Sequence, residues 1–153
     1  MLKFSLLHPQ ILSALGKAGH GSKILIADGN YPFSTRLGPK ADLVCLNLRP
    51  GLVSVTDVLE TIVTAVQIES AAVMEPSKTG PYAVKKDPDI FKNFVEIISQ
   101  QNPSAPPIKL QRVERLKFYQ QASSPDVCLT IATAEQRIFG NLLLTIGVVR
   151  TMN

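Results

Sequence analysis

The feature that most constrains this chain is a short apolar segment with a histidine before it and an aspartate at its end. Residues 24–27 (Ile-Leu-Ile-Ala) are continuously apolar, which is typical of a β-strand covered on both faces. His20 lies in a glycine-rich turn before this run, and Asp28 follows it directly. Open α/β sheets bind ligands at the tips of such strands, and histidine both accepts and donates protons near neutral pH. A histidine and a carboxylate so placed can share a site, and the segment predicts proton transfer without a cofactor.

Apolar residues elsewhere recur at the spacings of alternating helices and strands. Pro9 predicts the first turn of a helix, and Ser54-x-x-Asp57 approximates a capping box at the start of another. A third helix carries Ile90 on its apolar face, and a fourth spans 113–121. Strands are predicted at 23–27, 41–48, 70–74, 108–110, 127–132 and 140–149. This alternation favours an α/β sandwich with a largely parallel sheet flanked by helices, and we expect residues 1–153 to form a single domain.

Composition and charge argue against several classes of protein. The net charge is +4, but the basic residues are scattered and tryptophan is absent, which disfavours nucleic-acid binding. No run approaches the roughly 18 apolar residues that a membrane span needs, and the residues before Pro9 are too few for a signal segment. Cys45 and Cys128 lie in separate apolar runs, so we expect both to be small buried residues. Together these features predict a cytoplasmic protein.

Neither a metal site nor a dinucleotide site is expected. The only histidines, His8 and His20, have no ligand partner nearby in the sequence. Gly16, Gly19 and Gly21 precede a strand instead of following one, so no helix N-terminus would meet a pyrophosphate there. The site is therefore expected to work with its own side chains alone.

Several short motifs follow one another along the chain. They are Gly19-His20-Gly21, Asp28 with Pro32, Phe118-Tyr119, Phe139-Gly140-Asn141 and Gly147-Val148. In order and spacing they resemble the D-ribose pyranase and L-fucose mutarotase family, the RbsD/FucU family, over nearly the whole chain. The Gly-His-Gly opening and Gly140 are closer to the fucose branch. The resemblance implies a cofactor-independent isomerase that opens and recloses the ring of a monosaccharide, L-fucose or a related sugar.

The resemblance also implies roles for individual residues. His20 matches the family's catalytic histidine, which would take a proton from the anomeric hydroxyl and deliver one to the ring oxygen. The residues expected to bind the sugar are Asp28, Arg115, Phe139, Gly140 and Asn141. Arg115 is placed by its spacing from Phe118-Tyr119, and Arg112 takes its role if that register is off.

Two positions depart from the family pattern. Phe139 stands where the family has tyrosine, so a hydroxyl is missing, and Asn30 stands where a histidine is frequent. These departures keep two alternatives open beside the fucose mutarotase. One is a D-ribose pyranase, and the other is a catalytically weak protein that binds sugar or serves in assembly.

Family members are commonly ring-like decamers, so the resemblance implies a homo-oligomer, expected to be a decamer, with sugar sites at subunit contacts. The C-terminal run 142–149 offers a separate reason, because its side chains would alternate on a strand and present apolar groups to both faces. One of those faces needs a cover from outside the strand. A second subunit or a helix of the same chain would provide it.

Overall fold

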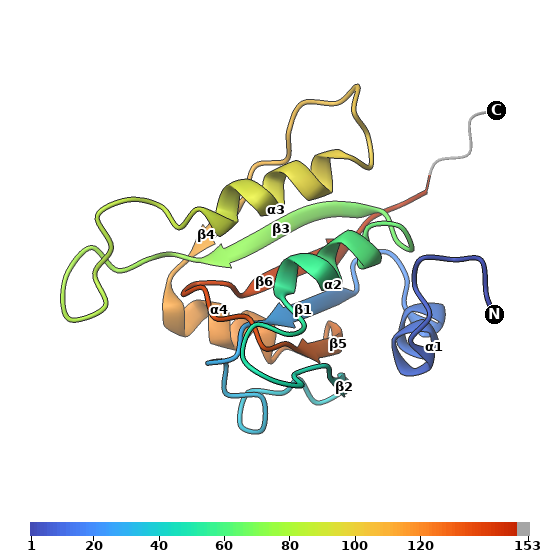
Figure 1. Ribbon diagram of the computed structural model, residues 1–153, viewed down its shortest axis with the longest axis horizontal. Coiled ribbons are helices and arrows are strands. Elements are labelled where there is room, and N and C mark those ends of the chain that lie inside the picture. The colour runs from blue at the N-terminus through green and yellow to red at the C-terminus, as the bar shows by residue number, and fades with distance from the viewer. Residues whose placement is uncertain (150–153) are drawn as a thin grey trace.

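The chain folds around one six-stranded sheet in the computed structural model, which describes residues 1–149 (Figure 1). The strands are β1 (Lys23–Ala27), β2 (Asp42–Cys45), β3 (Ile68–Met74), β4 (Gln111–Val113), β5 (Val127–Ala132) and β6 (Leu142–Ile146). The helices are α1 (Pro9–Lys17), α2 (Val55–Ile62), α3 (Ile90–Ser99) and α4 (Arg115–Ala122). The expected single domain extended to residue 153, and residues 150–153 lie outside the described range.

The strands follow the order β2-β5-β1-β6-β3-β4 across the sheet. Strands β2, β5 and β1 run parallel, as do β3 and β4, whereas β6 is antiparallel to both of its neighbours, β1 and β3. The predicted α/β fold with a largely parallel sheet is therefore confirmed. Strand β1 lies between β5 and β6, so its hydrogen-bonding groups are paired on both sides. Its side chains are buried on both faces of the sheet, as its continuous apolar sequence indicated.

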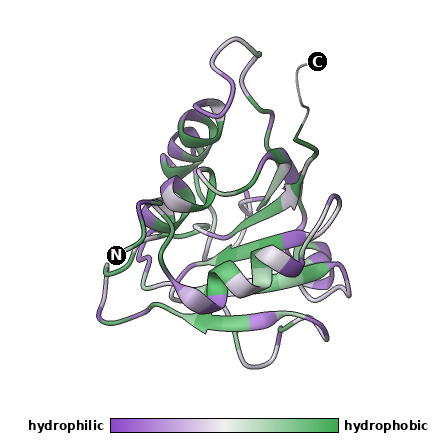
Figure 2. Cartoon of the chain, turned by 90° about the vertical axis from the view of Figure 1, so that its right-hand side faces the viewer, coloured by the Kyte–Doolittle hydropathy of each residue, from purple (hydrophilic) through white to green (hydrophobic). Residues whose placement is uncertain are grey.

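Two apolar cores lie on opposite faces of the sheet. Helices α1, α2 and α3 cover one face, where Ile24 and Ile26 of β1 are fully buried. Helix α4 covers the other face, where Phe118 packs with Leu25 and Ala27. The strands are accordingly green along most of their length in Figure 2.

Strand β6 is covered on both faces by its own chain. Leu142 and Leu144 face the core beneath α1, α2 and α3, and Leu143, only 3% exposed, faces the core beneath α4. The apolar C-terminal run therefore gives no reason to expect a second subunit, because the alternative of a cover from the same chain is the one observed. Val148 and Val149 beyond the strand are exposed.

Four local expectations were wrong, and they lie mostly at the two edges of the sheet. Cys45 is exposed, because it lies on edge strand β2. Cys128 is half-buried. Strand β2 itself is shorter than the predicted 41–48. At the other edge the strand is β4 rather than 108–110, because β4 is exposed and polar and so has no apolar pattern. Glu114 then caps α4, accepting hydrogen bonds from the N–H groups of Leu116 and Lys117, and delays the start of that helix to Arg115.

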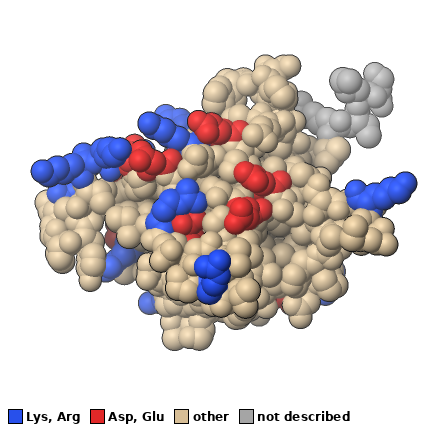
Figure 3. Space-filling model, viewed as in Figure 1, with Lys and Arg blue, Asp and Glu red and all other residues tan. Residues whose placement is uncertain are grey.

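Acidic and basic side chains are interspersed on the face shown in Figure 3, over α2 and α3. Among residues 1–149, no helix has both the length and the apolar character that crossing a membrane requires.

The predicted capping box at the start of α2 is confirmed and gives a stability test. The N–H of Asp57 donates to Ser54 Oγ at 3.1 Å, and the N–H of Ser54 donates to Asp57 Oδ2 at 2.9 Å. We expect Ser54→Ala to lower the free energy of unfolding by about 1 kcal/mol, because an N–H at the helix start loses its acceptor. Urea denaturation measures the change. Ser54→Asn, which keeps an acceptor, should lose less, and equal losses in both variants would contradict a capping role.

Candidate functional site

Asp28 and Asn141 hold each other at the end of β1. The side chain of Asn141 donates from Nδ2 to Asp28 Oδ2 at 2.9 Å, and the N–H of Asp28 donates to Asn141 Oδ1 at 2.9 Å. The N–H of Asn30 donates to the other carboxylate oxygen, Oδ1, at 3.0 Å. Both side chains are buried, at 3% and 5% exposure. Asn141 is therefore largely committed to Asp28, with less of its amide free for a sugar diol than the sequence indicated.

The environment of Asp28 changes its acidity. Burial raises the pKa of its carboxyl from 3.8 to about 6, and the negative charge of Glu135 acts in the same direction. The peptide N–H groups of Asn30, Gly140 and Tyr31 favour the ionised form and limit the rise. A carboxyl group with a pKa near 6 exists in both protonation states close to neutral pH, so it can give or take a proton.

The segment that supplies Asn141 has a constrained backbone beside Asp28. Phe139 has a φ of 61°, in the left-handed region that non-glycine residues seldom adopt. A Cβ on Gly140 would lie 3.0 Å from Glu135 Cγ and 3.3 Å from Asp28 Cβ. Only a residue without a side chain fits there comfortably. Phe139, Gly140 and Asn141 are thus brought to Asp28 as a unit, with the Phe139 ring packed against both apolar cores.

An ion pair that was not expected from the sequence anchors this segment. Arg137 donates from Nε to Glu135 Oε1 at 2.9 Å and from a terminal nitrogen to Oε2 at 2.7 Å. The N–H of Val55 at the start of α2 also donates to Glu135, at 3.3 Å. Burial disfavours ionised Glu135, but these hydrogen bonds outweigh it and hold the pKa of Glu135 below its ordinary value. Glu135 lies three residues after the end of β5. A carboxylate shortly after a buried strand is the sequence signal that identified Asp28, and the same signal could have identified Glu135.

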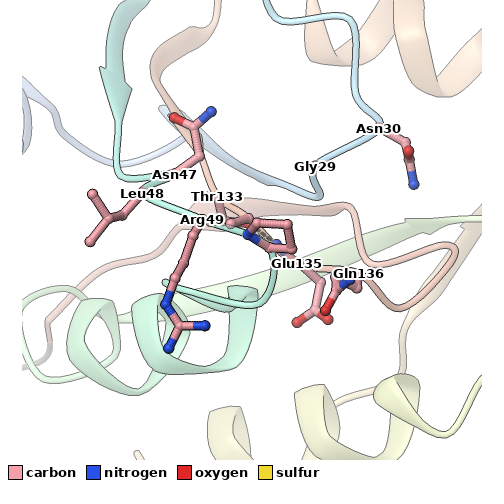
Figure 4. Close-up of a pocket in the computed structure, with 10 residues that line it drawn as sticks. Gly29, Asn30, Asn47, Leu48, Arg49, Thr133, Glu135 and Gln136 are labelled. Carbon is pink, nitrogen blue, oxygen red and sulfur yellow. Dashed lines mark hydrogen bonds between the residues drawn. The ribbon is translucent and has the colours of Figure 1, made fainter.

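A cleft of about 470 Å³ opens at the carboxyl ends of β1, β2 and β5, and is lined by the two residues that follow Asp28 but not by Asp28 itself. Its walls are residues 29–30, 47–50 and 133–136. Figure 4 shows Leu48 and Arg49 on one side of it, with Glu135 and Gln136 on another. The volume lies within the range of roughly 300 to 1,000 Å³ that small-molecule sites occupy, and this edge of a parallel sheet is where such sites form.

The two candidate arginines differ in their surroundings. Arg112 is bound to the carboxylate of Asp87, lies 3.7 Å from Glu75, and stacks over the Phe91 ring at 5.3 Å. It is engaged away from Asp28. Arg115 is exposed on the first turn of α4 and has no hydrogen bond or ion pair with the residues that the structure describes. Of the two, Arg115 is the one left available for a ligand, although it makes no contact with Asp28 or Asn141.

His20 does not join the Asp28 cluster within one chain. It lies before β1 and Asp28 lies after it, and the five residues of β1 span about 16 Å at the usual rise of a strand. Figure 1 shows that the two ends of β1 lie apart, at opposite ends of the strands that form the sheet. The His20 side chain is 59% exposed, and its Nε2 lies 2.9 Å from Oε2 of Glu69. The shared site that the sequence suggested is therefore not formed by a single copy of the chain.

Within residues 1–149, no group of three or more histidine, cysteine, aspartate and glutamate side chains is arranged to hold a metal ion.

Comparison with known proteins places this arrangement in context. The model of the RbsD / FucU transport protein family matches residues 1–149. A fucose mutarotase of Danio rerio is 29% identical over 151 residues, which cover 95% of this chain and 91% of that protein. A fucose mutarotase of Homo sapiens is 28% identical, with coverage of 94% and 90%.

Solved structures have the same fold. The structure of FucU from Bifidobacterium longum is 27% identical, with a TM-score of 0.75 and coverage of 94% of this chain and 95% of that one. The fucose mutarotase of Streptococcus pneumoniae, solved in complex with L-fucose, superposes with a TM-score of 0.76 at 21% identity, with coverage of 98% and 100%.

The raised pKa of Asp28 predicts how it affects stability. Because the folded pKa exceeds that of the unfolded chain, protonated Asp28 stabilises the fold at low pH, and this contribution is lost as the pH rises through about 6. A pKa raised from 3.8 to about 6 corresponds to about 3 kcal/mol of differential stability. The stability of the wild type relative to Asp28→Ala should therefore fall by about this amount between roughly pH 4 and pH 7. Urea denaturation across this range tests it, with exposed Asp42→Ala as the control, and a constant difference would contradict the shift.

Proposed function

This chain belongs to the RbsD/FucU family, and from that premise we propose that it is a cofactor-independent mutarotase acting on L-fucose or a related monosaccharide in the cytoplasm. The observation that carries the proposal is the buried carboxyl of Asp28, which is fixed by Asn141 at the sheet edge and has a pKa of about 6. The adjoining cleft is of a size to admit a monosaccharide.

Mutarotation needs two proton transfers. A base takes the proton of the anomeric hydroxyl while the bond between the anomeric carbon and the ring oxygen breaks, and an acid protonates that ring oxygen. The open aldehyde then turns and recloses on its other face by the reverse transfers. We assign the base to His20. Asp28 hydrogen-bonds the sugar hydroxyls, and its pKa near 6 also suits it to carry a proton during the exchange.

The remaining site residues have distinct roles in the proposal. Asn141 orients Asp28 through its two hydrogen bonds and leaves its second amide hydrogen for the sugar. Phe139 presents its ring face, and Gly140 lets the sugar-binding segment approach Asp28 closely. Arg115, exposed and unpaired among the described residues, reaches a sugar hydroxyl from the start of α4.

One monosaccharide is much shorter than the roughly 16 Å of β1, so it cannot contact His20 and Asp28 of the same chain. To contact both kinds of residue, it must lie between the His20 end of one β1 strand and the Asp28 end of a β1 strand in another copy. We therefore propose that His20 of one copy completes the Asp28 cluster of a neighbouring copy. If the contact is heterologous and its rotation closes, repeated copies of it form a ring, with one composite site at each contact. This supports the homo-oligomer, and a decamer built from two rings fits it.

A D-ribose pyranase remains the nearest alternative. A D-ribose pyranase of Paracidovorax citrulli is 34% identical over 73 residues, about half of each chain, so this likeness reaches only part of the site. The same two proton transfers would convert pyranose to furanose, with reclosure through a different hydroxyl. The departures at Phe139 and Asn30 are the reason for a third candidate, a protein that binds sugar and exchanges anomers weakly.

Saturation-transfer NMR between the α and β anomers of L-fucose tests the proposed reaction. We expect the wild type to accelerate exchange and His20→Ala to lose about 100-fold or more, because a positioned acid–base group contributes 10² to 10⁴. His8→Ala is the matched control, since His8 caps no helix with its side chain and lies outside the site. D-ribose, tested in parallel, separates the pyranase alternative. Sugar binding by the wild type without faster exchange of either sugar would contradict a mutarotase.

Co-expression of two inactive variants tests the composite site. His20→Ala and Asp28→Ala chains should each be inactive alone, but a mixed ring contains sites with His20 from one parent and Asp28 from the other. Random assembly restores about a quarter of the sites. Variants purified separately and mixed without subunit exchange provide the control. If the co-expressed mixture stays inactive while wild-type chains assemble and react, each site belongs to one chain.

A further inference from the structure

The histidine assigned as the base has a side-chain hydrogen-bond partner. His20 Nε2 lies 2.9 Å from Oε2 of Glu69, which comes from the beginning of β3, 49 residues further along the chain. The side chains are 59% and 44% exposed. Exposed ion pairs contribute roughly 0 to 1 kcal/mol to stability, so this contact adds little to the fold. Its geometry fits a carboxylate that orients a histidine.

Glu69 is placed by an irregularity in the sheet. In the pairing of β3 with β6, Ile68 lies opposite Ile146 and Ser70 lies opposite Thr145, so Glu69 is an extra residue with no partner. A bulge of this kind redirects a side chain and is frequent next to active sites. The bulge turns the Glu69 carboxylate toward the turn that carries His20.

Gly147 makes room for this arrangement. A Cβ at Gly147 would lie 2.9 Å from Glu69 Cβ, closer than real Cβ atoms approach, and 3.3 Å from the Glu69 nitrogen, which is also tight. The N–H of Gly147 donates to the carbonyl of Gln67 at 2.8 Å, which holds the end of β6 against the residues before the bulge. The backbone of Glu69 thus rests directly on a glycine.

The turn that carries His20 is hydrogen-bonded to the same end of β6. The N–H of Gly21 donates to the Ile146 carbonyl at 2.9 Å, and the N–H of Ile146 donates to the Ser22 carbonyl at 2.9 Å. Three strand termini therefore lie together at one end of the sheet's strands, as Figure 1 shows: the start of β1, the start of β3 and the end of β6. With both backbones fixed, the contact between His20 and Glu69 is held in position by main-chain hydrogen bonds.

We propose that Glu69 is a positioning residue for His20, an inference that rests on the proposed function. Its carboxylate accepts the Nε2–H of the imidazole, which selects that tautomer and leaves Nδ1 as the atom facing the sugar. Nδ1 takes the proton of the anomeric hydroxyl, and the imidazolium so formed is stabilised by the negative charge of Glu69. Nδ1–H then returns the proton to the sugar during ring opening and reclosure, so the cycle is balanced without a co-reactant.

The tautomer is measured without any sugar. Long-range ¹⁵N–¹H correlation on protein labelled at histidine separates the Nε2–H form from the Nδ1–H form. The chain has two histidines, and His8→Ala assigns the spectrum. We expect His20 to carry its proton on Nε2 in the wild type and to lose this preference in Glu69→Ala. A wild-type His20 protonated on Nδ1, or an identical spectrum in Glu69→Ala, would overturn the proposal.

The same variants separate positioning from binding in the anomer-exchange assay. Glu69→Ala should lower the exchange rate at saturating L-fucose about tenfold or more and leave sugar affinity unchanged, since a positioned acid–base group supplies 10² to 10⁴. Glu69→Gln keeps an oxygen acceptor without the charge and should fall between Glu69→Ala and the wild type. The control is Glu96→Ala, an exposed glutamate on α3.

The outcomes distinguish this proposal from the proposed function. An unchanged rate in Glu69→Ala, with His20→Ala inactive, would overturn the positioning role and keep the mutarotase. Absence of exchange in the wild type would remove the mutarotase, and the tautomer measurement would then decide alone whether Glu69 sets the protonation of His20. Equal rates and equal free energies of unfolding across all glutamate variants would mark the pair as an ordinary surface contact.

Discussion

The burial of the Asp28 carboxyl group determines how the candidate site is built at the end of β1. Removing Asp28 from water disfavours its charge, and the structure compensates with hydrogen bonds from Asn141 and from the peptide N–H of Asn30. Those bonds require the segment before β6 to lie against β1, which in turn requires Gly140 to have no side chain. Glu135 is held by Arg137 and α2 on the other side of that segment. The compensation is incomplete, and the residual cost appears as a pKa near neutrality.

Strand β1 serves as a spacer between two chemically different ends. At one end, main-chain hydrogen bonds to β6 fix the turn that carries His20, which stays exposed. At the other end, Asp28 is buried and hydrogen-bonded by Asn141 and Asn30. A rigid, doubly paired strand keeps these groups apart in every copy, so under the proposed mechanism assembly is a condition for chemistry. Because β6 is buried within its own chain, the support for the proposed assembly comes from the separation of His20 and Asp28 and not from the apolar side chains of that strand.

The sequence predicted what local patterns encode. The span of β1 and the capping box of α2 were confirmed residue by residue, because an apolar run and a cap each act over a few neighbouring positions. Strand β4 was misplaced because an exposed edge strand needs no apolar residues. Glu69 could not be found from sequence, since a bulge is set by pairing between β3 and β6, distant in the chain. The separation of His20 from Asp28 follows from the length of β1, and only the assembled sheet makes that separation explicit.

The departure at Phe139 bears on whether the site is weakened. Its φ of 61° sets the path by which Gly140 and Asn141 reach Asp28, and this is a property of the backbone that a missing hydroxyl does not remove. Tyr31 is a poor replacement, because its hydroxyl donates to the Arg36 carbonyl at 3.3 Å and burial raises its pKa to about 12. The contacts around Asp28 are thus complete without a tyrosine at this position. The proposed proton path through His20 and Asp28 uses no phenol, so phenylalanine at position 139 is compatible with the proposed mutarotase.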